Sequence, residues 1–141
     1  MTCFERTRRI RFSHCDPAGI VFFPQYLVML GDHVEDWVSE GLGIPYATLI
    51  GARRTGLPTV RLECDFRAIS RLGEDVTYSL RVTRLGTRSL TLATEVLGPA
   101  RDLRAAFVQV LVSTDLDTHR AVELPPDLRA AAMAFAPAPQ S

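Results

Sequence analysis

Apolar residues recur with a helical period in the segment that begins near Pro24. They fall at steps of three and four residues as far as about Glu40: Leu27, Leu30, Val34, Trp37 and Val38. Pro24 suits the first turn of a helix, where its missing N–H has no partner to lose. Gly41 and Gly43, followed by Pro45, favour an end to the helix. The pattern predicts one helix from Pro24 to about Glu40.

The first half of this predicted helix is unusual because residues 26–30 are apolar all the way round, whereas the second half is acidic. A helix that is apolar on every side must be surrounded by other elements rather than laid on a surface. We therefore expect the rest of the chain to wrap around it.

Much of the remaining chain alternates between apolar and polar residues, the period of a β-strand. The clearest case is 59–68, and the pattern returns at 76–82, 89–97 and 104–114. A short strand is also expected at 6–12. Turn residues at short intervals, with no helical pattern between them, favour an antiparallel meander.

These elements predict an α+β architecture in which a curved antiparallel sheet of about five strands wraps around one long central helix. We expect a single domain over residues 1–141, with its core at about 5–125 and an Ala- and Pro-rich tail at 130–141 that is flexible. The edge strands of such a sheet are available to pair with a second copy.

The charge composition limits the possible functions. Sixteen basic and sixteen acidic residues give no net charge, which disfavours nucleic acid as a partner. Every basic residue is Arg, so a Schiff-base lysine and a Ser–Lys dyad are excluded. The absence of Asn excludes the Cys-His-Asn arrangement. Chemistry must therefore come from carboxylates, His, Cys, hydroxyls or backbone groups.

Sequence signals for secretion or membrane insertion are absent. The longest apolar stretch, 18–30, is interrupted by Pro24 and Gln25 and is too short to span a bilayer. The first residues lack the apolar segment of a signal peptide, and Cys3, Cys15 and Cys64 have no metal or redox spacing. We expect a cytoplasmic protein with no membrane partner.

The loop before the predicted helix contains the most informative carboxylate, Asp16. Its ordinary explanation is an Asx-turn, in which the side chain bonds to the backbone two residues on. However, the helix start at 22–24 offers free N–H groups and the positive end of the helix dipole, which can stabilise an oxyanion. An acid beside an oxyanion site is what hydrolysis of an acyl bond requires.

The run from Cys15 to Tyr26 resembles the signature of the 4-hydroxybenzoyl-CoA thioesterases of the Pseudomonas type, in the hotdog superfamily, and of related short-chain acyl-CoA thioesterases. The matching residues are Asp16, Pro17, Ala18, Gly19, Ile20, Val21, Pro24 and Tyr26. The order of the predicted elements also agrees with a hotdog fold.

The resemblance implies an acyl-CoA thioesterase whose site lies at a dimer interface. The protein would then be a homodimer or a homotetramer. We expect no cofactor and no metal. Asp16 would be the catalytic carboxylate, as nucleophile or general base, and the N–H of Phe23 would polarise the thioester carbonyl. The implied substrate-binding residues are Phe22, Tyr26, Gly31, Leu57 and Pro58. The implied CoA-binding residues are Arg84, Arg88 and Ser89, although the two arginines also suit solvated turn positions.

Two positions argue against a phenolic acyl group. Gly31 stands where an acid would help to bind a phenol, and Leu57 is apolar where a hydroxyl would help. They favour a less polar or larger substrate within the aromatic and the short- or medium-chain acyl groups.

Several alternatives stay open at this point. His14, Cys15 and Asp16 are adjacent in sequence, which is a poor arrangement for a metal site, and Cys15 as a nucleophile would need a well-placed base. His14 could instead orient Asp16 or cap the loop. A hotdog hydratase or dehydratase would use a His with a carboxylate on a β-hydroxyacyl chain. A non-catalytic acyl-CoA-binding module would not need Asp16.

Overall fold

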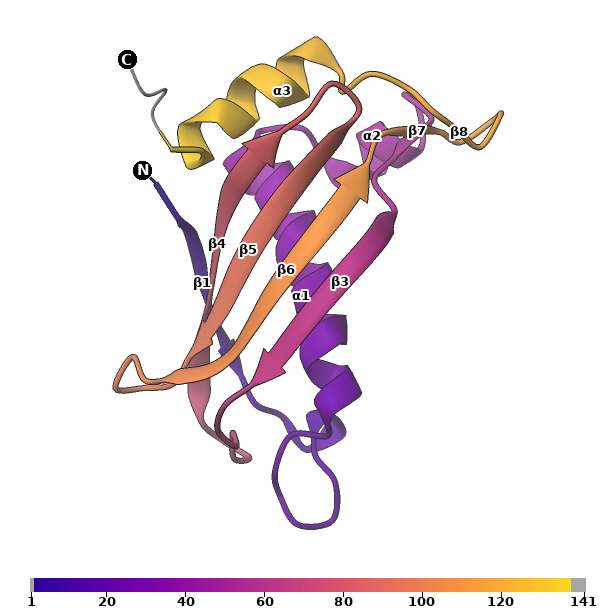
Figure 1. The fold of residues 1–141 in the computed structure, drawn as a ribbon. Coiled ribbons are helices and arrows are strands. Elements are labelled where there is room, and N and C mark those ends of the chain that lie inside the picture. The colour runs from indigo at the N-terminus through magenta and orange to yellow at the C-terminus, as the bar shows by residue number, and fades with distance from the viewer. Residues whose placement is uncertain (1, 138–141) are drawn as a thin grey trace.

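The computed structural model describes residues 2–137 and has a five-stranded antiparallel sheet at its centre. The strand order is β1-β4-β5-β6-β3, and the sheet curves around the long helix α1 (Phe23–Asp36) (Figure 1). This is the α+β hotdog architecture that the sequence predicts. The strands are β1 (Phe4–Arg9), β3 (Thr59–Phe66), β4 (Asp75–Leu85), β5 (Ser89–Leu97) and β6 (Leu103–Val112).

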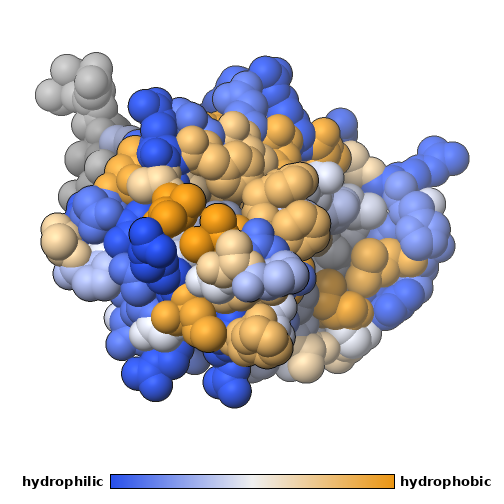
Figure 2. All heavy atoms as spheres, turned by 90° about the horizontal axis from the view of Figure 1, so that it is seen from below, coloured by the Kyte–Doolittle hydropathy of each residue, from blue (hydrophilic) through white to orange (hydrophobic). Residues whose placement is uncertain are grey.

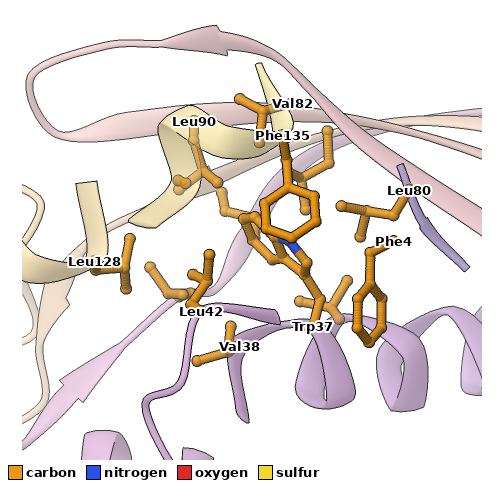
Figure 3. Packing of buried hydrophobic residues seen from close by; sticks show 14 of the residues in the cluster. Phe4, Trp37, Val38, Leu42, Leu80, Val82, Leu90, Leu128 and Phe135 are labelled. Atoms are coloured by element: carbon orange, nitrogen blue, oxygen red, sulfur yellow. The ribbon is translucent and has the colours of Figure 1, made fainter. Parts of the chain in front are cut away.

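The helix continues beyond α1 as one wider turn, η2 (Trp37–Gly41), so the predicted end near Glu40 is confirmed. Trp37 is fully buried and lies in the middle of the main core (Figure 3). Its ring packs edge-on against the ring of Phe135, with 5.9 Å between the ring centroids. The centroids of the Phe135 and Phe4 rings are 6.4 Å apart. The core thus joins the first strand, the helix and the end of the chain.

Several short elements do not follow from the periodicity of the sequence. They are the turn η1 (Phe12–His14), the helix α2 (Tyr46–Ile50), a small sheet of β2 (Thr55–Gly56), β7 (Thr114–Asp115) and β8 (Arg120–Ala121), the helix α3 (Pro126–Ala132) and the turn η3 (Met133–Phe135). The expectation of a flexible tail from Ala130 is wrong for residues 130–135. These residues are folded, because Ala132 and Phe135 are buried against the core. Residues 138–141 of the expected tail lie outside the described part.

The predicted strand 59–68 forms as β3, but the apolar face of β3 is not covered within this chain. Val60, Leu62 and Phe66 keep 60%, 38% and 44% of their surface exposed. On α1, Val28 is more than half exposed and Gly31 is also open to solvent. The helix is therefore surrounded only in part, and apolar surface remains on α1 and at the β3 edge.

Candidate active site

The loop that carries Asp16 folds back on itself before α1 begins. A short antiparallel bridge joins Cys15 to Val21, and the Asp16 N–H donates to the carbonyl of Ile20 at 3.0 Å. Between them, Gly19 has a φ of +75°, a conformation that glycine adopts without steric cost. The bridge brings Asp16 back towards the first residues of the helix.

The Asp16 carboxylate is partly engaged in this loop. Its Oδ1 accepts a hydrogen bond from the Ala18 N–H at 2.9 Å, so the Asx-turn is present. No protein donor to Oδ2 is found within residues 2–137, and the side chain is half-buried. The turn therefore fixes the orientation of the carboxylate and leaves Oδ2 available to contact a bound molecule.

The start of α1 leaves one backbone donor without a partner. Phe22 precedes the helix in an extended conformation, and no side chain caps the helix. Pro24 has no N–H, and the Gln25 N–H donates to the Phe22 carbonyl at 2.8 Å. The N–H of Phe23, the first helical residue, has no intrahelical acceptor. It lies at the positive end of the helix dipole, the arrangement that binds a developing negative charge.

A cavity of about 270 Å³ opens beside this donor. Its residues come from the helix start, from the end of β3 and from the segment that follows β3: Val21, Phe23, Tyr26, Phe66, Arg67, Ala68 and Ile69. The ring of Phe66 lies 5.9 Å from the rings of both Phe23 and Tyr26. An apolar group bound here would touch aromatic surface while its polar end reached the helix start.

This end of the molecule also presents large apolar side chains to solvent. Figure 2 looks onto it from below and shows apolar residues gathered across the face, with hydrophilic residues between them. The side chains of Phe12, Phe22, Phe23, Ile69 and Leu72 are each about half exposed or more.

His14 and Cys15 have local structural roles. The Arg11 N–H donates to His14 Nδ1 at 2.9 Å, so His14 caps the short turn η1. The Cys15 thiol donates to the Arg11 carbonyl at 3.4 Å, and burial raises the pKa of the thiol. A thiol held in its protonated form is a poor nucleophile. Of the roles left open for His14, capping is the one that forms.

Five other predicted site residues lie at the opposite end of the sheet: Leu57, Pro58, Arg84, Arg88 and Ser89. Leu57 is buried in the main core, and the Pro58 carbonyl accepts from Val112, the residue paired with Ser89. Arg88 is exposed, and Arg84 lines a second cavity of about 420 Å³ beside α3. Pro58 and Phe66 are eight positions apart along the strand, about 26 Å at 3.3 Å per residue. One chain therefore does not bring these residues to Asp16.

Two residues behind the cavity were missed by the sequence reasoning. Ser70 is fully buried and accepts the Tyr26 hydroxyl at 2.8 Å, and Arg104 is only 8% exposed. Arg104 stands at the start of the last long strand, next to its alternating apolar residues. This position was the one sequence signal for a buried charge. Nothing local marked Ser70.

Between residues 2 and 137, no three His, Cys, Asp or Glu side chains lie together as a metal ion would require. In the same range, no helix has the length and apolar character needed to cross a membrane.

Comparison with known proteins identifies the family of this architecture. The model of the thioesterase-like superfamily matches residues 10–132. The chain belongs to this superfamily. The 4-hydroxybenzoyl-CoA thioesterase of Pseudomonas sp. (strain CBS-3) is 28% identical over 127 residues, 85% of this chain and 90% of the relative. The 1,4-dihydroxy-2-naphthoyl-CoA hydrolase of Synechocystis sp. is 31% identical over 85 residues, which span 60% of either chain.

Solved structures agree with the sequence matches. A gentisyl-coenzyme A thioesterase superposes with a TM-score of 0.82 at 25% identity, covering 91% of this chain and 98% of the other. A thioesterase-superfamily structure from Jannaschia sp. CCS1 reaches a TM-score of 0.88 at 26% identity, covering 96% and 94%. The predicted hotdog fold and the class of thioester hydrolase are confirmed. The roles of the individual site residues stay predictions.

Proposed function

We propose that this protein is an acyl-CoA thioesterase that hydrolyses its substrate at the N-terminus of α1. Water and the thioester give a free carboxylic acid and the thiol of CoA. The Phe23 N–H binds the carbonyl oxygen as it becomes negative, and the Asp16 carboxylate either attacks the carbonyl carbon or takes a proton from the attacking water. A thioester is already activated, so one carboxylate and one oxyanion donor suffice.

The observation that carries the proposal is the Phe23 N–H, which has no acceptor in the described part of the chain and lies beside an apolar cavity. The absence of a side-chain cap leaves this donor available, and the Cys15–Val21 bridge keeps the Asp16 loop beside it. A turn aspartate without a catalytic role would require neither a cavity nor an uncapped helix.

A second copy of the chain would complete the site. Within residues 2–137 the edge strand β3 pairs only with β6, and its apolar face is open. If two β3 edges pair antiparallel about the middle of the strand, the Thr59 end of one copy lies opposite the Phe66 end of the other. Such a pairing would bring one end of each copy to the other end of its partner. The residues brought together would be Asp16 and Phe23 from one copy with Pro58, Arg88 and Ser89 from the other. This arrangement supports the homodimer that the resemblance implies.

The cavity favours an aromatic or otherwise apolar acyl group. The rings of Phe23, Tyr26 and Phe66 border it. The relatives named above act on hydroxybenzoyl, dihydroxynaphthoyl and gentisyl thioesters. Because Gly31 and Leu57 offer no polar group for a phenol, we propose a less polar or larger acyl group for this chain.

The test is a thiol-release screen across aromatic, short and medium acyl-CoAs, made with the wild type and with Asp16→Asn. The variant should lower kcat by about 10²- to 10⁴-fold, the range for a positioned acid–base group. Its fold should survive because Asn also forms the Asx-turn. Asp115→Asn is the matched control, since Asp115 likewise accepts a backbone N–H two residues on, at 2.8 Å.

The two roles of Asp16 separate in a single turnover in heavy-oxygen water. If Asp16 is the nucleophile, solvent oxygen enters its carboxylate or an original carboxylate oxygen passes to the product acid. If Asp16 is a general base, only the product acid is labelled and the protein is not. If Asp16→Asn hydrolyses the best thioester at the wild-type rate, Asp16 is only a turn residue and the proposed mechanism is wrong.

A further inference from the structure

A buried arginine outside the catalytic loop holds the wall of the cavity together. The Arg104 side chain, near the start of β6, reaches the segment between β3 and β4. Its guanidinium donates to the Ile69 carbonyl at 2.8 Å and to Ser70 Oγ at 3.2 Å. It also pairs with both oxygens of Glu74 at 3.0 Å and with Asp102 at 2.6 Å. These contacts raise the pKa of Arg104, so the group is always charged.

The backbone of Arg104 holds the neighbouring part of the same wall. Its carbonyl accepts hydrogen bonds from Arg67 at 2.9 Å and Ala68 at 3.2 Å. Residues 67, 68 and 69 all line the cavity beside Phe23. The entire segment from 67 to 70 is therefore bonded to this one residue.

From Ser70 the contacts continue to the helix start and to the catalytic loop. The Tyr26 hydroxyl, in the first turn of α1, donates to Ser70 Oγ at 2.8 Å. The Val21 N–H donates to the Ser70 carbonyl at 3.0 Å. Val21 is also the residue that forms the bridge with Cys15 in the catalytic loop. Tyr78 adds a second anchor by donating to the Tyr26 carbonyl at 2.9 Å. Arg104 is thus two hydrogen bonds from the helix that offers the Phe23 N–H.

We propose that Arg104 is a positioning residue for thioester hydrolysis, acting through Ser70 and Tyr26 on the start of α1. This inference rests on the proposed function. A buried ion pair alone is weak evidence for stability, and a purely structural Arg104 would need only its two carboxylates. Here the guanidinium also bonds to neutral groups of the cavity wall. A misplacement of about 1 Å at a reacting centre can cost 10²-fold in rate.

Two variants test the chain of contacts at different links. Arg104→Lys keeps the charge and loses the planar fork that bonds to Glu74, Ile69 and Ser70 together. Ser70→Ala keeps Arg104 and removes the hydroxyl that joins it to Tyr26. Each should lower kcat by about ten- to a hundredfold while KM for the best acyl-CoA stays within about twofold. The second variant decides the matter if the first does not fold.

Arg101→Lys is the matched control. Arg101 also forms a two-pronged ion pair, with Glu5, but that pair is exposed and lies away from the cavity. The control should keep both kcat and KM. Arg104→Lys with Ser70→Ala in one chain should be little slower than the slower single variant, because both act on the same contact path.

The outcomes separate the two proposals. A wild type that hydrolyses no thioester removes the proposed function. A wild type that is active, with single variants that keep kcat within twofold at a temperature well below their Tm, refutes the role of Arg104 alone. Independent, multiplying losses in the double variant would also refute it, because they would place the two residues on separate paths.

Discussion

His33 makes the stability of this fold depend on pH in a direction that can be worked out from its contacts. The imidazole is fully buried on the inner side of α1. Nε2 lies 3.0 Å from the Phe4 carbonyl, which can only accept, so this nitrogen carries the proton. Nδ1 lies 3.0 Å from Arg8 Nη2 and accepts its hydrogen. The neutral ring is fully satisfied, whereas a second proton would remove the Arg8 bond.

Burial is the main reason that the pKa of His33 falls from 6.5 to about 4, and the charges of Arg8 and Arg6 contribute, opposed in part by Asp36 and the Phe4 carbonyl. In the unfolded chain His33 takes up a proton near pH 6.5, but in the folded chain only near pH 4. The stabilisation is therefore complete above pH 6.5 and is lost as the pH falls from there towards 4. At about 1.4 kcal/mol per tenfold difference in proton affinity, the full loss is about 3 kcal/mol.

The assay is urea unfolding at a fixed protein concentration between pH 7 and pH 5, with the wild type and His33→Gln. Linkage gives a loss of about 2 kcal/mol over this range for His33. Gln offers the same donor and acceptor and does not titrate, so its curve should be flatter by that amount. His119→Gln is the control, because His119 is exposed. Parallel curves for wild type and His33→Gln would refute the reasoning.

Two further predictions concern CoA and assembly. If the exposed Arg88 contacts a CoA phosphate, Arg88→Ala should raise KM several-fold with little change in kcat, and added salt should bring the wild type closer to the variant. An unchanged KM for a full CoA ester would return Arg88 to a solvated turn. Light scattering should give a mass of at least a dimer, because the edge of β3 leaves backbone N–H and C=O groups free to pair with another strand. A fully active monomer at assay concentration would contradict the composite site.

The sequence predicted the parts of the fold whose residues repeat with a strong local period. Such repeats predicted the helix after Pro24 and strands at 59–68, 76–82, 89–97 and 104–114, which form with slightly different ends as α1, β3, β4, β5 and β6. Periodicity identifies the apolar face of a strand but not what covers it, so the open face of β3 was not foreseen. The tail was misjudged because its Ala and Pro content hid the helical spacing of Leu128, Ala132 and Phe135, all of which are buried.

The candidate site divides in a similar way. Asp16 and Phe23 are seven positions apart in one loop and helix start, so a local motif predicts both. Ser70 and Arg104 lie 44 and 78 positions beyond Tyr26 in sequence, and the pairing of β3 with β6 brings them together behind the cavity. No residue type or spacing near either of them indicates that contact.

The place of β3 at the edge of the sheet would make this strand a reporter of pairing with a second copy. Because β3 has a neighbouring strand on one side only among residues 2–137, every second amide along it bonds to β6 and the others point away from the sheet. In a lone chain, the outward amides would exchange with heavy water far faster than the inward ones. When another strand pairs with the edge, both sets become slow. The ratio of exchange rates between adjacent amides of this strand therefore measures subunit association, and the inward amides serve as the reference within the same molecule.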